Sequence, residues 1–169
     1  MPGKIALAGG NEFRPNCEPM DLALLAGFER PPRVCILPTA ARENPRLAAQ
    51  NGIRHFRRLG AQTREVGILN ERDARDPRYI SLLAEADLFY FAGGDPVYLF
   101  NVLQNSPAWD EMARLWREGR LLAGSSAGAM VLGEKMWDPA KGWREGLGLL
   151  PRLAVLPHLV RREPVEGPL

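Results

Sequence analysis

The chain has 169 residues, of which 46% are hydrophobic and 25% are charged, as in an ordinary soluble globular domain. Its 22 basic and 20 acidic residues leave a formal net charge of +2, which argues against nucleic acid or a membrane surface as the main partner. The two cysteines, Cys17 and Cys35, form no metal or redox motif, and no apolar run approaches a membrane span. We therefore expect a cytoplasmic protein with free thiols and without a metal or cofactor.

Short apolar runs predict strands at intervals along the whole chain, with helical patterns between most of them. The predicted strands cover residues 4–8, 34–37, 64–68, 88–92, 121–123 and 153–156. The predicted helices cover residues 45–59, 79–86, 96–103 and 107–117, and Asp95 and Ser106 are expected N-caps before prolines. Strands that are apolar throughout favour a sheet covered on both faces. The alternation of strands and helices predicts a mostly parallel sheet in a three-layer α/β/α sandwich.

One short stretch, Gly124-Ser125-Ser126-Ala127-Gly128, stands between an apolar strand and a predicted helix. It matches the pattern G-x-S-x-G, in which small neighbours let the backbone turn sharply and expose the central hydroxyl, here that of Ser126. The N–H of Ala127 would then donate to the oxyanion that forms when this serine attacks a carbonyl. The pentapeptide alone leaves a second interpretation open, a strand–helix junction built from small residues for close packing.

A nucleophilic serine needs a base, and the chain has two histidines. His55 lies in the arginine-rich stretch "IRHFRR" and is expected to be a solvated surface residue. His158 follows the last predicted strand, and the carboxyl ends of strands are where open α/β sheets place their sites. His158 is therefore the candidate base. Candidates for an acid between nucleophile and base are Glu134, Asp138 and Glu145.

Five stretches in order resemble the dipeptidase E and cyanophycinase family of serine peptidases, which have a class I glutamine amidotransferase-like fold. They are "IALAGGNE" (5–12), "ILPTAARE" (36–43), "FYFAGGDPVYLFNVL" (89–103), "GSSAGAMVL" (124–132) and "GLGLLPRLAVLPHL" (146–159). The resemblance implies that Ser126 is the nucleophile, that His158 is the general base, and that Gly94, or else Gly93, supplies the second oxyanion N–H beside Ala127. Glu134 fits the third member of the triad best by its distance from the histidine, and Asp138 is second.

The chain also departs from this family pattern. Family members continue further past the histidine, whereas this sequence has eleven residues after His158. We expect a single peptidase E-like domain over residues 1–169 with a shortened C-terminal part. Either the chain is a trimmed family member, or a partner chain in a homodimer completes the region, or substrate binding has been lost. Arg161, followed by Arg162, suits an acidic peptide or isopeptide substrate because guanidinium groups bind carboxylates as a fork. The competing hypothesis is a catalytically impaired member that acts as a binding or assembly protein.

Overall fold

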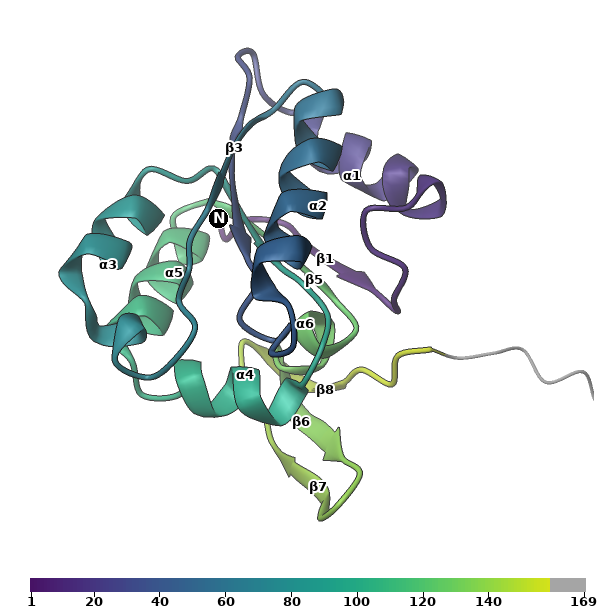
Figure 1. Cartoon of the computed structure of the whole chain (residues 1–169), viewed down its shortest axis with the longest axis vertical. Helices are drawn as coiled ribbons and strands as arrows, with labels where there is room; N and C mark the ends of the chain where they lie inside the picture. The colour runs from purple at the N-terminus through teal and green to yellow at the C-terminus, as the bar shows by residue number, and fades with distance from the viewer. Residues whose placement is uncertain (159–169) are drawn as a thin grey trace, which may run out of the picture.

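The computed structural model describes residues 1–158, and these are organised around a five-stranded sheet (Figure 1). Its strands lie in the order β1-β5-β4-β2-β3, and every neighbouring pair is parallel. The strands are β1 (Ile5–Ala8), β2 (Arg33–Leu37), β3 (Gln62–Glu65), β4 (Leu88–Phe91) and β5 (Leu121–Ser125). The chain returns by helices after β2, β3 and β4, as parallel pairing requires, so the predicted mixed α/β fold is confirmed.

Helices cover both faces of this sheet. One face packs against α1 (Glu18–Leu25) and α2 (Pro45–Arg58), and the other against α3 (Pro77–Ala84), α4 (Pro96–Leu103) and α5 (Pro107–Arg117). Successive side chains of a strand point to opposite faces, so Leu88 and Tyr90 join one apolar cluster while Phe89 and Phe91 join the other. Strands buried on both sides explain the uninterrupted apolar runs in the sequence.

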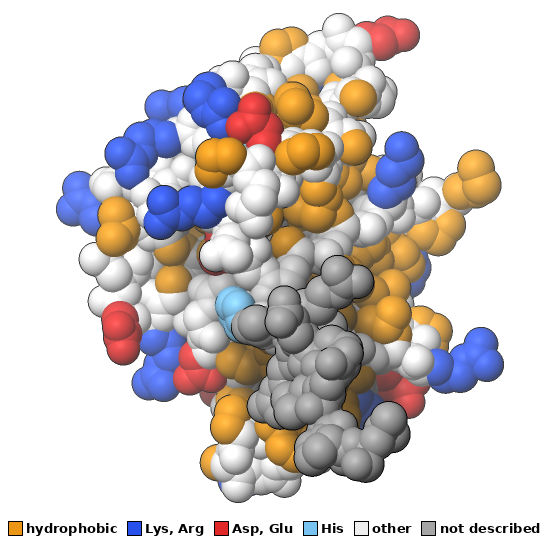
Figure 2. Space-filling model, turned by 90° about the vertical axis from the view of Figure 1, so that its right-hand side faces the viewer, with side chains coloured by type: hydrophobic (Ala, Val, Ile, Leu, Met, Phe, Trp, Pro, Cys, Tyr) orange, Lys and Arg blue, Asp and Glu red, His pale blue; other side chains and the backbone are white. Residues whose placement is uncertain are grey.

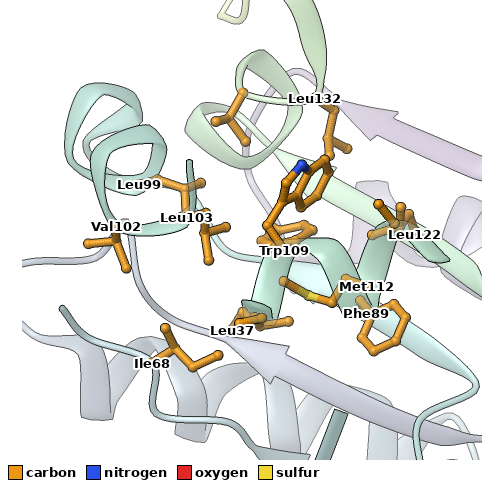
Figure 3. Close-up of a cluster of buried hydrophobic side chains, with 14 of the residues drawn as sticks. Leu37, Ile68, Phe89, Leu99, Val102, Leu103, Trp109, Met112, Leu122 and Leu132 are labelled. Atoms are coloured by element: carbon orange, nitrogen blue, oxygen red, sulfur yellow. The ribbon is translucent and has the colours of Figure 1, made fainter. Parts of the chain in front are cut away.

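The larger cluster forms most of the core (Figure 3). Leu37, Phe89 and Leu122 of the sheet face Leu103 of α4 and Met112 of α5, and all five side chains are buried. Burying one such side chain stabilises a protein by about 1.5–3 kcal/mol. This cluster holds the helices that follow β4 against the sheet and so fixes the loops at the carboxyl ends of its strands.

The helix starts follow their capping residues. The side chain of Asp95 accepts the N–H of Tyr98 at the start of α4, and Ser106 accepts that of Trp109 at the start of α5, as predicted. α3 begins two residues before its predicted start because Asp76 caps Arg78 ahead of Pro77. Two short 3₁₀ turns, Pro15–Cys17 and Asp73–Arg75, precede α1 and α3.

The structure corrects the sequence-based expectations in the C-terminal part of the described chain. After a one-turn helix α6 (Ala127–Met130), a second sheet forms, with the order β7-β6-β8. It comprises β6 (Gly133–Asp138), β7 (Gly142–Glu145) and β8 (Leu150–Ala154). The strand predicted at 153–156 therefore ends earlier and belongs to this second sheet, not to the main one.

Two further differences lie in the N-terminal half of the chain. β3 ends at Glu65 instead of residue 68, and α1 was not predicted.

The hairpin of β6 and β7 projects from the main sheet (Figure 1). Its tryptophans, Trp137 and Trp143, stack edge to face with ring centroids 5.5 Å apart, yet each keeps about half of its surface exposed. Figure 2 shows hydrophobic side chains exposed on one face of the molecule.

Over residues 1–158, none of the helices is long and apolar enough to cross a lipid bilayer.

Candidate active site

Ser126 occupies the turn between β5, which lies between β1 and β4 in the main sheet, and α6. Its backbone angles, φ 49° and ψ −111°, lie in a sparsely populated region for a residue with a side chain. Such a conformation costs on the order of 1–3 kcal/mol and persists only where the surrounding structure enforces it. A junction made only for close packing does not need this strain, so the geometry favours the nucleophile interpretation of the pentapeptide.

The side chain of His158 meets this serine. Ser126 Oγ and His158 Nε2 are 2.8 Å apart, a hydrogen-bond distance, although the two residues come from different parts of the fold. His158 lies on the segment that follows β8, and its backbone N–H donates to the carbonyl oxygen of Gly9, 2.9 Å away. The structure thus places together the two residues whose pairing the sequence predicts.

The turn after β1 carries the imidazole. Gly10 has φ +145°, and a Cβ atom at this position would lie 2.5 Å from Cε1 and 2.7 Å from Nδ1 of His158. A side chain at Gly10 would therefore displace the ring. This glycine was given no role from the sequence, although its place directly after an apolar strand is a signal that could have marked it.

Two backbone N–H groups are available near the serine hydroxyl. The N–H of Gly93 donates to Glu12 Oε1 at 2.8 Å, whereas the N–H groups of Gly94 and Ala127 donate to no acceptor within the described part of the chain. Gly94 has φ +142°, and a Cβ there would come within 2.0 Å of the carbonyl oxygen of Ala40. Of the two candidates, Gly94 is thus the one with a free donor.

The neighbouring serine points elsewhere. Ser125 is fully buried, and its hydroxyl donates to Glu12 Oε2 at 2.8 Å. The alternation of side chains along a strand separates Ser125 from Ser126, as expected, and gives the two hydroxyls different partners. Glu12 was not identified from the sequence, although an acidic residue just after the glycine turn of β1 falls at the functional end of the sheet.

The three candidate acids bind other groups in the structure. Glu134 Oε2 accepts the backbone N–H of Arg152 at 2.7 Å, and Glu145 forms an ion pair with Lys135. Asp138 accepts the N–H of Ala140 and is paired with Arg144, and these contacts lower the pKa of its carboxyl. None of the three forms a hydrogen bond with His158 among the described residues.

His55 differs from its sequence-based expectation. It is 5% exposed, and its Nε2 lies 2.8 Å from Asp21 Oδ2 in the buried space between α1 and α2. Burial raises the pKa of Asp21. The prediction of a solvated surface residue was wrong because α1, which covers this histidine, was not recognised in the sequence.

Two hollows adjoin the candidate site. One of about 870 Å³ runs from Gly93 and Gly94 along Arg42 to the start of α2. The other, of about 450 Å³, lies between Glu12 and the arginines Arg14, Arg54 and Arg58. Arg161, the predicted substrate-binding residue, lies outside the described residues. Within residues 1–158, no group of three or more His, Cys, Asp and Glu side chains could hold a metal ion.

A parallel sheet between helices, with a strained serine and an imidazole at the carboxyl end of an interior strand, defines the class of α/β proteins with a nucleophile elbow. The chain belongs to peptidase family S51, whose family model matches residues 5–166.

Individual relatives agree with this membership. A cyanophycinase from Nostoc sp. (strain PCC 7120 / SAG 25.82 / UTEX 2576) is 32% identical over 141 residues, covering 76% of this chain and 47% of that protein. The crystal structure of a peptidase from an acI-B1 Actinobacterium is similar with a TM-score of 0.84 and 32% identity, over 94% of this chain and 69% of that one. A putative peptidase E protein from Listeria monocytogenes EGD-e, with a TM-score of 0.62 and 22% identity over 80% of this chain and 64% of that one, supports the fold.

These matches confirm the resemblance identified from the five motifs. The chain spans about half the length of the curated relatives that it matches.

Proposed function

We propose that this chain is a serine peptidase that hydrolyses a peptide or isopeptide bond next to an acidic residue. The observation that carries the proposal is the 2.8 Å distance between Ser126 Oγ and His158 Nε2 at a strained strand–helix turn. Membership of a peptidase family supports the same reaction class. The alternative, a catalytically impaired binding protein, has no need of an aligned serine and histidine.

The proposed mechanism is acyl transfer. Ser126 Oγ attacks the carbonyl carbon while His158 Nε2 takes the hydroxyl proton, and the carbonyl oxygen becomes an oxyanion. The N–H groups of Gly94 and Ala127 stabilise that charge. The imidazolium then gives its proton to the leaving amine as the C–N bond breaks. A water molecule attacks the acyl-enzyme in the same way and releases the acid and the free serine.

An acidic substrate suits the charges around the site. Arg14, Arg54 and Arg58 line the hollow beside Glu12, and Arg58 is paired with Glu18. Arginine binds carboxylates with two parallel hydrogen bonds. Together with the net charge of +2 and with Arg161, these side chains favour peptides that carry aspartate or a related acid. The cyanophycinase relatives make Asp–Arg isopeptides of the cyanophycin type a second substrate class to test.

The third member of the triad stays a prediction. Glu134 is the sequence-based candidate, and the described residues pair its carboxylate with the backbone of Arg152. We also propose a homodimer and a cytoplasmic setting, the latter because Cys17 and Cys35 are both free thiols. Sedimentation equilibrium tests the dimer.

The test is covalent labelling followed by hydrolysis assays. A fluorophosphonate probe should label wild-type protein at Ser126, identified by peptide mass spectrometry, and Ser126→Ala should abolish labelling. The same substitution should lower kcat/KM on N-terminally acidic dipeptides and acidic isopeptides by on the order of 10⁴-fold or more, because the covalent route disappears. Ser125→Ala is the matched control and should keep the label. A folded wild type with neither label nor hydrolysis would support the impaired binding protein instead.

A further inference from the structure

Glu12 lies where three strands of the main sheet end. It follows the glycine turn after β1, its Oε1 accepts the N–H of Gly93 just past β4, and its Oε2 accepts the hydroxyl of Ser125 at the end of β5. Both distances are 2.8 Å. One half-buried carboxylate therefore connects the glycine turn that follows β4 to the strand that carries the serine.

This connection holds the turn that carries one of the two oxyanion donors of the proposed mechanism. The Gly93-Gly94 turn could rotate its peptide groups, since glycine has no Cβ to restrict it. Holding the N–H of Gly93 on Glu12 fixes the peptide plane between Ala92 and Gly93, at the entrance to the turn, and the next N–H, that of Gly94, donates to no acceptor among the described residues. The turn is close to the nucleophile, because a Cβ on Gly93 would lie 3.4 Å from the Cβ of Ser126.

We propose that Glu12 is a positioning residue, which holds the Gly93-Gly94 turn so that the Gly94 N–H faces the oxyanion formed on Ser126. The inference rests on the function proposed above and deepens it. It also gives Ser125 a purpose, since its hydroxyl holds the second oxygen of the same carboxylate. Donors act on a transition state with most effect when they need no reorganisation, and Glu12 supplies that rigidity.

Glu12 acts through geometry and not through its charge. A carboxylate charge beside a developing oxyanion opposes that charge, so the benefit must come from the hydrogen bonds that it accepts. Glutamine keeps an oxygen that can accept the Gly93 N–H and an amide group that can bind the Ser125 hydroxyl. Alanine removes both contacts. The two substitutions therefore separate the geometric role from the charge.

The test compares Glu12→Ala and Glu12→Gln on a dipeptide substrate, with Glu29→Ala, an exposed carboxylate on another loop, as the control. Glu12→Ala should lower kcat by about 10²-fold, the usual loss of one oxyanion donor, while KM changes less than about threefold. Its affinity for a peptide aldehyde, which forms a tetrahedral adduct on the serine, should fall in parallel with kcat. Glu12→Gln should recover kcat to within about tenfold of wild type, and Glu29→Ala should match wild type.

A second measurement does not depend on turnover. Amide hydrogen exchange should show the Gly93 N–H protected in wild type and at least about tenfold faster in Glu12→Ala. The proposal is overturned if Glu12→Ala keeps kcat, if Glu12→Gln is as impaired as Glu12→Ala, or if Gly93 exchange is unchanged. A wild type without label or hydrolysis overturns the proposed function and this role with it. An active wild type with an equally active Glu12→Ala overturns the role alone.

Discussion

Two carboxylates lie at opposite ends of the main sheet, and their surroundings differ. Asp87 stands just before β4 and is fully buried. It accepts hydrogen bonds from the guanidinium groups of Arg30 and Arg120 and from the backbone N–H of Arg33, at 2.7–2.9 Å. Glu12, at the carboxyl end, is only half-buried and accepts from a neutral N–H and a hydroxyl.

The two ends of the main sheet use charged side chains differently. Burial acts to raise the pKa of Asp87, but the hydrogen bonds from Arg30 and Arg33 outweigh it and leave the pKa lowered. This end ties the loops before β2 and β4 and the start of β5 together, and so serves stability. The opposite end leaves donors free for a substrate, as open α/β sheets do at the carboxyl ends of their strands.

Among these predictions, the largest effect on stability is expected for substitution of Asp87. Asp87→Ala removes the buried acceptor of these hydrogen bonds, while the arginines that lose it stay partly exposed, so the free energy of unfolding should fall by about 2–3 kcal/mol. That is roughly a 30- to 150-fold change in the folding equilibrium, measured by urea denaturation. The control Asp110→Ala removes an exposed carboxylate of α5 and should cost less than about 0.5 kcal/mol. Folded Asp87→Ala should still bind the fluorophosphonate probe, and loss of labelling in the folded protein would contradict the separation of the two ends.

At the functional end, Gly10→Ala should lower kcat by about 10²-fold. The new methyl group would displace the imidazole of His158, and a shift of about 1 Å in a catalytic group costs this much. Gly60→Ala is a matched control, because Gly60 also has a positive φ, +90°, but has open space around its Cβ position. It should lose some stability and keep its kcat. Equal kcat values for the two variants would show that the ring does not depend on the turn after β1.

The contribution of Asp87 to stability should depend on pH. The lowered pKa of Asp87 means that its contribution to stability is present above its unfolded pKa, near 3.9, and is lost as pH falls through the folded value. The difference in unfolding free energy between wild type and Asp87→Asn should therefore be constant above about pH 5 and shrink below about pH 4. Urea denaturation at a series of pH values measures it. A difference that does not shrink at all between pH 5 and pH 2 would contradict the assignment.

A smaller effect is expected for the second serine. Ser125→Ala removes one of the two hydrogen bonds on Glu12 and leaves the one to Gly93 in place, so kcat should fall by no more than about tenfold. Steady-state kinetics beside Ser126→Ala measures it. A loss as large as that of Ser126→Ala would mean that the stretch "GSSAGA" is a structural junction.

The smallest effect is expected for Glu134→Gln. The amide oxygen of glutamine can still accept the N–H of Arg152, so the described geometry predicts a kcat within about threefold of wild type. A triad acid would instead cost on the order of 10⁴-fold. An unchanged kcat removes Glu134 from the triad, and a large loss in a folded variant establishes it as the acid.

The sequence predicted the parts of the fold that depend on local patterns. Apolar runs and capped prolines located β2, β4, β5, α4 and α5, because burial on both faces and N-caps leave clear marks. The strands of the second sheet have no such pattern in the sequence. β6 and β7 alternate weakly, and β8 contains Pro151, Arg152 and exposed side chains, so neither period nor propensity separated these strands from loops.

The sequence predicted those residues of the candidate site that belong to a recognisable motif, and missed those that do not. Ser126 and His158 come from recognisable segments, and the structure places them together. Glu12 and Gly10 could not be inferred in the same way, because Glu12 contacts residues more than 80 positions away and Gly10 contacts a ring carried by the segment after β8. His55 was misread for a similar reason, since its burial depends on α1 and on Asp21.

The attachment of His158 to Gly9 has a consequence for biosynthesis. The histidine follows the serine by 32 positions and reaches it only after the chain has passed through β6, β7 and β8. A nascent chain on the ribosome that has extended only as far as α6 therefore exposes a hydroxyl without its proton acceptor. Under the proposed mechanism, a chain that ends before β8 has no base for Ser126, so the order of translation delays acylation of this serine until the second sheet and His158 have been made.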